Sequence, residues 1–183
     1  MKTFVLSIVL YFLLLPFYGI GQVLPAILER DTVQEKITRL TADFDSVIFA
    51  DIASYFIEDL KINGFGYKRN DIYKVTISFK NSPSYELSGL KCKKIIKRKK
   101  LDLIRSLNYS FIEELSSDSL AIRSRTDIQQ RVSDASNWTV LIIKGKKSIL
   151  KQSYAPEIYQ KAAPTGEREK FMEIIKKILF ILD

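Results

Sequence analysis

The stretch from Asp71 to Lys80 shows the strictest alternation of apolar and polar residues in the chain, and it sets the fold class. Its apolar side chains stand at every second position: Tyr73, Val75, Ile77 and Phe79. Because successive side chains of a strand point to opposite faces, this pattern predicts a β-strand with one buried and one solvated face. Residues 81–84 predict a turn, and Tyr85 to Cys92 is the expected hairpin partner.

A second hairpin is expected nearer the C-terminus. Trp138 to Ile143 is almost wholly apolar and rich in β-branched residues, which is typical of a central strand covered on both faces. Lys144 to Lys147 supplies a turn with a glycine, and Ser148 to Tyr154 is the predicted return strand.

Helical spacing, with apolar residues every three to four positions, precedes these strands. It predicts one helix within Val23 to Asp43, after Pro25, and a second from Phe44 to Ile62. Asn63 to Gly66 is expected to end the second helix, since Asn and Gly supply the left-handed geometry of a helix end. Val47 to Phe49 leaves open a strand at the start of that segment.

Further helices are expected over Leu101 to Leu115 and, capped by Thr126, over Asp127 to Asp134. Tyr154 to Pro164 is expected to be a loop that leads to a last helix capped by Thr165. The apolar residues of that helix form a wide stripe that is expected to dock on the sheet: Phe171, Ile174, Ile175, Ile178, Ile181 and Leu182.

These elements predict an α+β fold in a single domain over residues 22–183. We expect an antiparallel sheet of about four strands, covered mainly on one face by helices, the C-terminal helix among them. The 162 residues that follow position 21 are enough for one domain with a core of its own.

The first 21 residues have the pattern of a secretory signal peptide. Lys2 precedes an apolar run from Phe4 to Leu15, then Pro16, and Gly19 and Gly21 stand three and one residues before the expected cut. The pattern indicates export to the periplasm or the medium. An uncleaved segment that anchors the chain in a membrane is the alternative, because the apolar stretch approaches the length that spans a bilayer.

The composition excludes several classes of active site. The chain has no His, and Cys92 is its only cysteine. These absences remove the imidazole base, the Cys-His pair, every Cys/His zinc site and any intramolecular disulfide. We therefore expect no metal site, no cofactor and no catalysis.

A basic run is the strongest local signal for binding. Seven of the ten residues from 91 to 100 are cations: Lys91, Lys93, Lys94, Lys97, Arg98, Lys99 and Lys100. The whole chain carries a net charge of +8, or +7 once Lys2 is removed, so the run accounts for the net charge of the exported form. Held together, these cations would bind phosphates, sulfates or carboxylates. The alternative is a solvated face that keeps an edge strand from pairing with other chains.

The expected partners are anionic. In an exported protein they would be anionic lipid, lipopolysaccharide, acidic glycan or acidic protein, with weak association to a membrane surface. Nucleic acid is not expected, because no aromatic residues interleave the run. The sequence thus predicts an exported, non-catalytic domain that binds an anionic envelope component or acidic partner through residues 91–100.

Two other functions remain open. The first is a small exported hydrolase that uses carboxylates, such as Asp43, Asp45 and Asp51, or a Ser-Lys pair. Two Ser-x-x-Lys matches occur, at Ser88 and Ser148, but both lie in predicted strands, where residues three apart point to opposite faces. The second is an assembly subunit that docks a partner through residues 178–182 or 154–164.

Cys92 has two interpretations. Its neighbours Lys91 and Lys93 would lower the pKa of the thiol and make it reactive. Alternatively, it is a small half-buried residue of a strand, as free cysteines commonly are.

Overall fold

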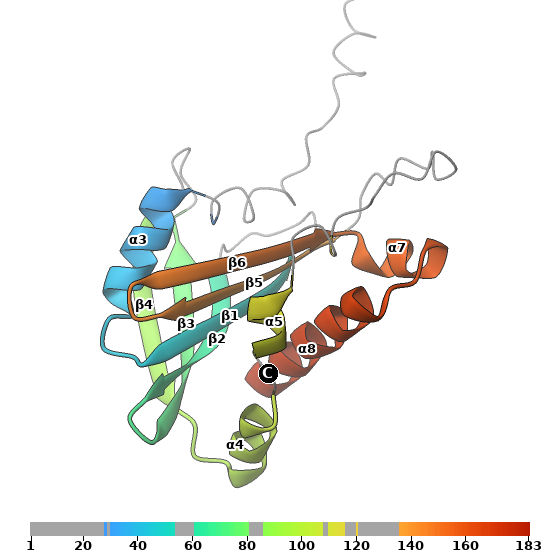
Figure 1. Ribbon diagram of the computed structural model, residues 1–183. Coiled ribbons are helices and arrows are strands. Elements are labelled where there is room, and N and C mark those ends of the chain that lie inside the picture. The colour runs from blue at the N-terminus through green and yellow to red at the C-terminus, as the bar shows by residue number, and fades with distance from the viewer. Residues whose placement is uncertain are drawn as a thin grey trace, which may run out of the picture.

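The computed structural model describes residues 28, 30–53, 61–80, 86–107, 110–115, 120 and 136–183. Within these residues the chain forms one antiparallel sheet with the strand order β4-β3-β2-β1-β5-β6 (Figure 1). The strands are β1 (Ser46–Ala53), β2 (Lys61–Lys68), β3 (Asp71–Phe79), β4 (Leu87–Lys94), β5 (Asn137–Lys144) and β6 (Lys147–Tyr154).

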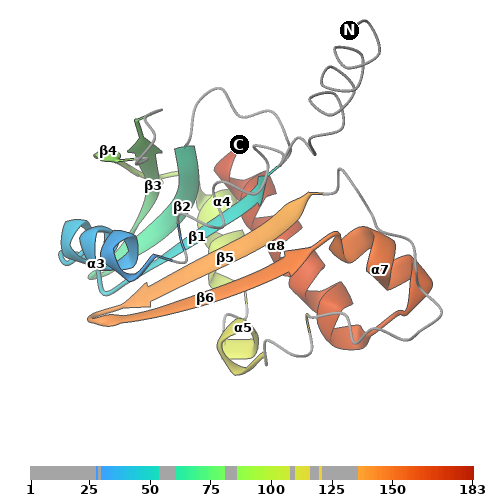
Figure 2. The ribbon, with the colours of Figure 1, turned by 90° about the horizontal axis from the view of Figure 1, so that it is seen from above.

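Helices lie on both faces of this sheet (Figure 2). They are α3 (Asp31–Leu40), α4 (Arg98–Arg105), α5 (Ser110–Glu114), α7 (Pro156–Ala162) and α8 (Gly166–Leu182). The face on which α8, α4 and α5 pack is called the α8 face below, and the opposite one the α3 face. Helices therefore cover mainly one face, as expected, with α3 as the exception.

Each face carries its own hydrophobic core, and alternate residues of the central strands supply them. Ile48 of β1 and Ile142 of β5 belong to the α8-face core, with Phe171 and Ile175 of α8. Their neighbours in sequence belong to the α3-face core: Val47, Phe49, Leu141 and Ile143. The sequence of a strand that is buried on both faces is almost continuously apolar, which explains the composition of β5.

The sheet is curled. Helix α3 contacts both β4 and β6, which are the two edge strands. One short helix can touch both edges only if the α3 face is concave. The concave face and the helix inside it are visible from above (Figure 2).

The structure confirms the predicted α+β class and the four predicted strands, but the sheet has six strands rather than about four. Residues 71–80, 85–92, 138–143 and 148–154 correspond to β3, β4, β5 and β6. The last helix is also confirmed: all six residues of the predicted stripe are buried, and the Thr165 hydroxyl accepts a hydrogen bond from the Arg168 N–H.

The predicted helix from Phe44 to Ile62 is wrong, because this segment contains β1 and the start of β2. Apolar residues on both faces of β1 produce a run in which helical spacing occurs by coincidence. The predicted helix end at Asn63 to Gly66 is also wrong, since these residues lie inside β2. The two glycines answer a packing need: a Cβ on Gly64 would lie 2.3 Å from the carbonyl oxygen of Ile48, and one on Gly66 would lie 2.6 Å from the ring of Phe44.

Three other segments differ in detail. The helix expected within Val23 to Asp43 is α3, which begins at Asp31. The helix expected over residues 101–115 is two helices, α4 and α5. The expected loop from residue 154 to 164 contains α7, which begins at Pro156. Proline suits the first turn of a helix because its ring fixes φ near the helical value. The N–H group that proline lacks would have no intrahelical partner at that position.

The remaining predictions fall outside the described residues. These are the signal peptide (1–21), the turn at 81–84 and the helix at 127–134. Of the helices that the structure describes, none is both long enough and apolar enough to span a bilayer.

Candidate functional site

The basic run is divided between an edge strand and the start of a helix. Lys91, Lys93 and Lys94 lie on β4, and all three are exposed. Lys91 and Lys93 pair in register with Thr76 and Lys74, which places them on the α8 face. Lys94 is on the opposite face, because neighbouring residues of a strand alternate.

Two of the seven cations have partners within the fold. The Nζ of Lys94 lies 2.7 Å from the Asp71 carboxylate, and this hydrogen bond raises the pKa of Lys94. The Nζ of Lys100 donates a hydrogen bond of 2.7 Å to the carbonyl oxygen of Ile181, near the end of α8. Lys74, outside the run, donates to the carbonyl oxygen of Leu182. These two lysines satisfy main-chain carbonyls that a helix end leaves without intrahelical partners.

Lys97, Arg98 and Lys99 form an exposed cationic group at the beginning of α4. Lys97 occupies the N-cap position without a side-chain capping bond, and the first turn contains no acidic residue. The positive end of the helix dipole is there, so cations at this position are unfavourable and anions favourable. The three cations at this end of α4 are therefore unfavourable for the helix, and an anion bound there would offset their effect.

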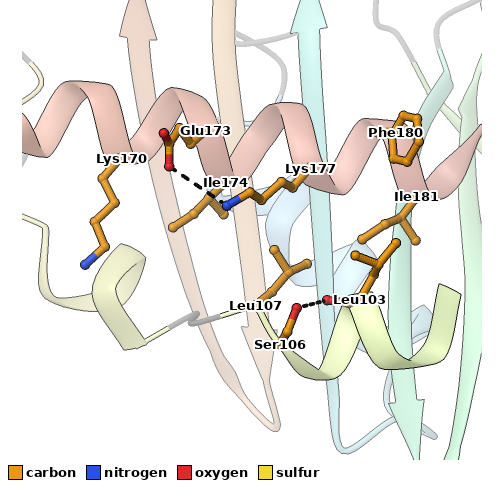
Figure 3. Close-up of a pocket in the computed structure, with 9 residues that line it drawn as sticks. All are labelled: Leu103, Ser106, Leu107, Lys170, Glu173, Ile174, Lys177, Phe180 and Ile181. Carbon is orange, nitrogen blue, oxygen red and sulfur yellow. Dashed lines mark hydrogen bonds and ion pairs between the residues drawn. The ribbon is translucent and has the colours of Figure 1, made fainter. Parts of the chain in front are cut away.

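Large apolar side chains are exposed beside this cationic group. Ile96 precedes it and is 80% exposed, Leu103 of α4 is 45% exposed and Phe180 of α8 is 75% exposed. Leu103 and Phe180 line the same groove between α4 and α8, about 380 Å³ in volume (Figure 3). The hydrogen bond from Lys100 to Ile181 places the first turn of α4 near the end of α8, the helix that carries Phe180. We call Ile96, Lys97, Arg98, Lys99, Leu103 and Phe180 the α4/α8 surface.

The wall of the groove is apolar and its rim is charged. Leu103 of α4 and Leu107, two residues after that helix ends, face Ile174 and Ile181 of α8 across it (Figure 3). On the rim, the Nζ of Lys177 lies 3.9 Å from the Glu173 carboxylate. The rim thus carries two cations, Lys170 and Lys177, and one anion, Glu173, around an apolar wall.

Sequence reasoning found the cations of this surface and missed its apolar part. Ile95 and Ile96 stand together inside the basic run. The structure separates them: Ile95 packs against the α8-face core, and Ile96 points to solvent. The only sequence signal for Phe180 was its position outside the predicted stripe of α8, a property that it shares with Met172 and Leu179.

Cys92 is neither a thiol with a lowered pKa nor a half-buried residue, the two interpretations that the sequence left open. It is exposed, although partial burial of its thiol raises the pKa of Cys92 above the usual value, against the opposing effect of Lys68. The expectation that Lys91 and Lys93 lower this pKa is wrong. These two lysines are neighbours in sequence, but they lie on the opposite face of β4.

The two Ser-x-x-Lys pairs lie in strands, as predicted. Ser148 and Lys151 point to opposite faces of β6. Ser88 lies where the register between β3 and β4 shifts, so the alternation rule does not apply to Ser88 and Lys91. The hydroxyl of Ser88 donates to the carbonyl oxygen of Ser78 at 2.9 Å. The hydroxyl of Ser148 lies 2.6 Å from the side-chain oxygen of Gln34, and Lys151 donates to the carbonyl oxygen of Leu115.

The three candidate carboxylates, Asp43, Asp45 and Asp51, do not lie on one helix, although two of them fall within the helix predicted from Phe44 to Ile62. Asp43 and Asp45 lie between α3 and β1. Asp43 pairs with Lys68 at 3.2 Å, and Asp45 accepts a hydrogen bond of 2.8 Å from the N–H of Arg69, in the β2–β3 turn. Asp51 lies on β1, where burial raises its pKa to about 6 against the effect of the Ile52 N–H.

No group of three or more carboxylate or cysteine side chains that could hold a metal ion occurs in the described part of the chain. No protein-family model, no curated protein and no solved structure matches the sequence or the fold.

Proposed function

We propose that this protein is an exported, non-catalytic domain that attaches to an anionic lipid surface through the α4/α8 surface. The observation that supports the proposal is the exposure of Ile96 and Phe180 beside Lys97, Arg98 and Lys99. Binding at a lipid surface combines burial of apolar side chains at the headgroup boundary with attraction of cations to anionic headgroups. The α4/α8 surface offers both.

The apolar residues favour lipid over the other anionic partners. An acidic glycan or a free phosphate would engage the cations alone and leave Ile96 and Phe180 in water. Burial of one large apolar side chain stabilises by about 1.5–3 kcal/mol. Two such side chains therefore contribute as much as several headgroup contacts, which are worth about 1 kcal/mol per cation.

The charge distribution supports the same partner. Lys97, Arg98 and Lys99 are exposed, and the positive end of the α4 dipole adds to their field. Lys91 and Lys93 extend the cationic area along the α8 face of β4. Lys94 and Lys100, which have partners within the fold, are not needed for binding.

Sedimentation with lipid vesicles tests the proposal. The form from Gln22 to Asp183 is mixed with phosphatidylethanolamine vesicles that contain phosphatidylglycerol, and with phosphatidylcholine vesicles as the uncharged reference. We expect binding to the anionic vesicles only, weakened by salt because exposed charges are screened. The triple variant Lys97→Gln, Arg98→Gln, Lys99→Gln should bind about a hundredfold more weakly, at about 1 kcal/mol per cation.

Matched control variants distinguish binding through the α4/α8 surface from an effect of net charge or of exposed apolar residues in general. Lys146→Gln, Lys147→Gln, Lys161→Gln removes three exposed cations elsewhere and should bind as the unaltered chain does. Ile158→Ser removes an exposed apolar side chain of α7, and Ile96→Ser with Phe180→Ser removes the two most exposed apolar side chains of the α4/α8 surface. Equal loss in both cation triples, or no effect of the Ile96 and Phe180 changes, would contradict the proposal.

A further inference from the structure

A row of polar side chains crosses the concave α3 face, away from the α4/α8 surface that is proposed to bind lipid. Asp51 of β1 lies opposite Thr139 of β5 in the register of the sheet, and Thr139 lies opposite Gln152 of β6. Asn137 lies two residues before Thr139 and so shares its face. The α3-face core stops short of this row, since its members on β5 are Leu141 and Ile143.

Each of these four side chains has a buried polar atom without a hydrogen-bond partner among the described residues. The atoms are Oδ2 of Asp51, Oγ1 of Thr139, Oδ1 of Asn137 and Nε2 of Gln152. Thr139 is only 3% exposed. An unsatisfied buried polar group costs about 1–3 kcal/mol, and native proteins contain few of them. Four in one register-aligned group indicate a site that is completed by something other than these residues.

The chemistry of the four atoms indicates the ligand class. Three are oxygens, on Asp51, Thr139 and Asn137, and one of these is a carboxylate. Directly opposite residues of a sheet have Cβ atoms about 5 Å apart and diagonal ones about 7–8 Å, so the three side chains can converge on one atom between β1 and β5. An alkylammonium group has three donors and a positive charge. It would satisfy the three oxygens and compensate the buried carboxylate, while Gln152 would donate to a neighbouring hydroxyl or carbonyl of the ligand.

We propose that the concave face binds a small primary ammonium compound, with Asp51, Thr139 and Asn137 around its nitrogen and Gln152 beside it. The raised pKa of Asp51 agrees with this, because a buried carboxylate without a cation is destabilised in its charged form. The site is separate from the α4/α8 surface, since the two lie on opposite faces of the sheet.

Thermal unfolding with three amine probes tests the proposal: methylammonium, ethanolamine and putrescine, each as the chloride at matched ionic strength. Ethylene glycol is the uncharged counterpart of ethanolamine and controls for hydroxyl binding. A ligand that binds only the folded state raises Tm, and we expect at least one amine to raise it by about 2–4 °C with no effect of ethylene glycol. Asp51→Asn and Thr139→Val should each abolish the rise.

The variants also show whether the row is structural. Without ligand, Asp51→Asn and Thr139→Val should unfold at the same temperature as the unaltered chain or above it, because each removes a group that lacks a partner. The proposal is overturned if none of the three amines raises Tm, if ethylene glycol acts as ethanolamine does, or if Asp51→Asn keeps the response. A lower Tm of Thr139→Val together with no amine response would identify the row as a structural water site.

Discussion

The ammonium group of Lys100 donates a hydrogen bond of 2.7 Å to the main-chain carbonyl of Ile181, and this contact joins the basic run to the end of the last helix. Lys74 donates to the next carbonyl, that of Leu182. Cations at the C-terminal end of a helix interact favourably with its dipole. The same contact ties the first turn of α4, which follows Lys97 and contains Arg98 and Lys99, to the end of the helix that carries Phe180.

Lys100→Met should destabilise the fold by about 1 kcal/mol, since a charge-assisted hydrogen bond to a helix end is lost. Lys99→Met is the matched control: Lys99 is exposed, and its substitution should change the free energy of unfolding by less than about 0.5 kcal/mol. Urea unfolding followed by circular dichroism measures both. Vesicle binding should show the reverse order, with the larger loss in Lys99→Met. Equal stability of the two variants would contradict a structural role for Lys100.

Gly64→Ala should destabilise the protein by about 2–3 kcal/mol, because an added Cβ would lie 2.3 Å from the carbonyl oxygen of Ile48 and 2.7 Å from the ring of Phe49. The neighbouring strand cannot give way without breaking the pairing of β1 with β2. Gly89→Ala on β4 is the control, since no atom lies within 4 Å of its added Cβ. We expect that substitution to be neutral or slightly stabilising in the same urea assay. Similar losses at both positions would show that strand propensity, not the close approach, decides the effect.

The Gly64 contact also explains why the sequence predicts only part of this fold. Strands with one polar face, such as β3, have an alternating pattern and were predicted, as was α8 from its apolar stripe. Strand β1 is buried on both faces, and β2 contains Asn63, Gly64 and Gly66, which locally favour a helix end. Their strand geometry depends on partners far along the chain, such as β5, which a local pattern does not contain.

The candidate sites, too, are partly predictable from the sequence and partly not. Charge is a property of the sequence, so the cations of residues 91–100 were found at once. Which of them are free depends on tertiary contacts, such as that of Lys94 with Asp71. The row of Asp51, Thr139 and Gln152 joins three strands, and only the register of the sheet brings it together.

Cys92 should react slowly with iodoacetamide at neutral pH. Burial raises the pKa of its thiol above the ordinary value of 9.0, so the thiolate fraction at pH 7 is smaller than that of free cysteine, and the rate should still be rising as the pH passes 9.0. Because Cys92 is the only cysteine, mass spectrometry of the intact protein measures its alkylation directly. Lys68→Met removes the opposing cation and should slow the reaction further. A rate at pH 7 above that of free cysteine would contradict this account.

Asp51→Asn should make the protein more stable above pH 6 and leave it nearly unchanged near pH 4. Burial raises the pKa of Asp51 from 3.8 to about 6, so the folded state disfavours the charged carboxylate. Stability is therefore greatest when Asp51 is protonated, falls as the pH rises from about 4 to about 6, and is constant above that range, with a total change of about 3 kcal/mol. Asparagine does not titrate, so the variant should lack this decline. Urea midpoints from pH 4 to pH 8 measure it, with Asp102→Asn, at an exposed position of α4, as the control for a lost negative charge. If the curves of Asp51→Asn and the unaltered chain run parallel, Asp51 is not held in a desolvated environment, and the ammonium site on the concave face loses its electrostatic basis.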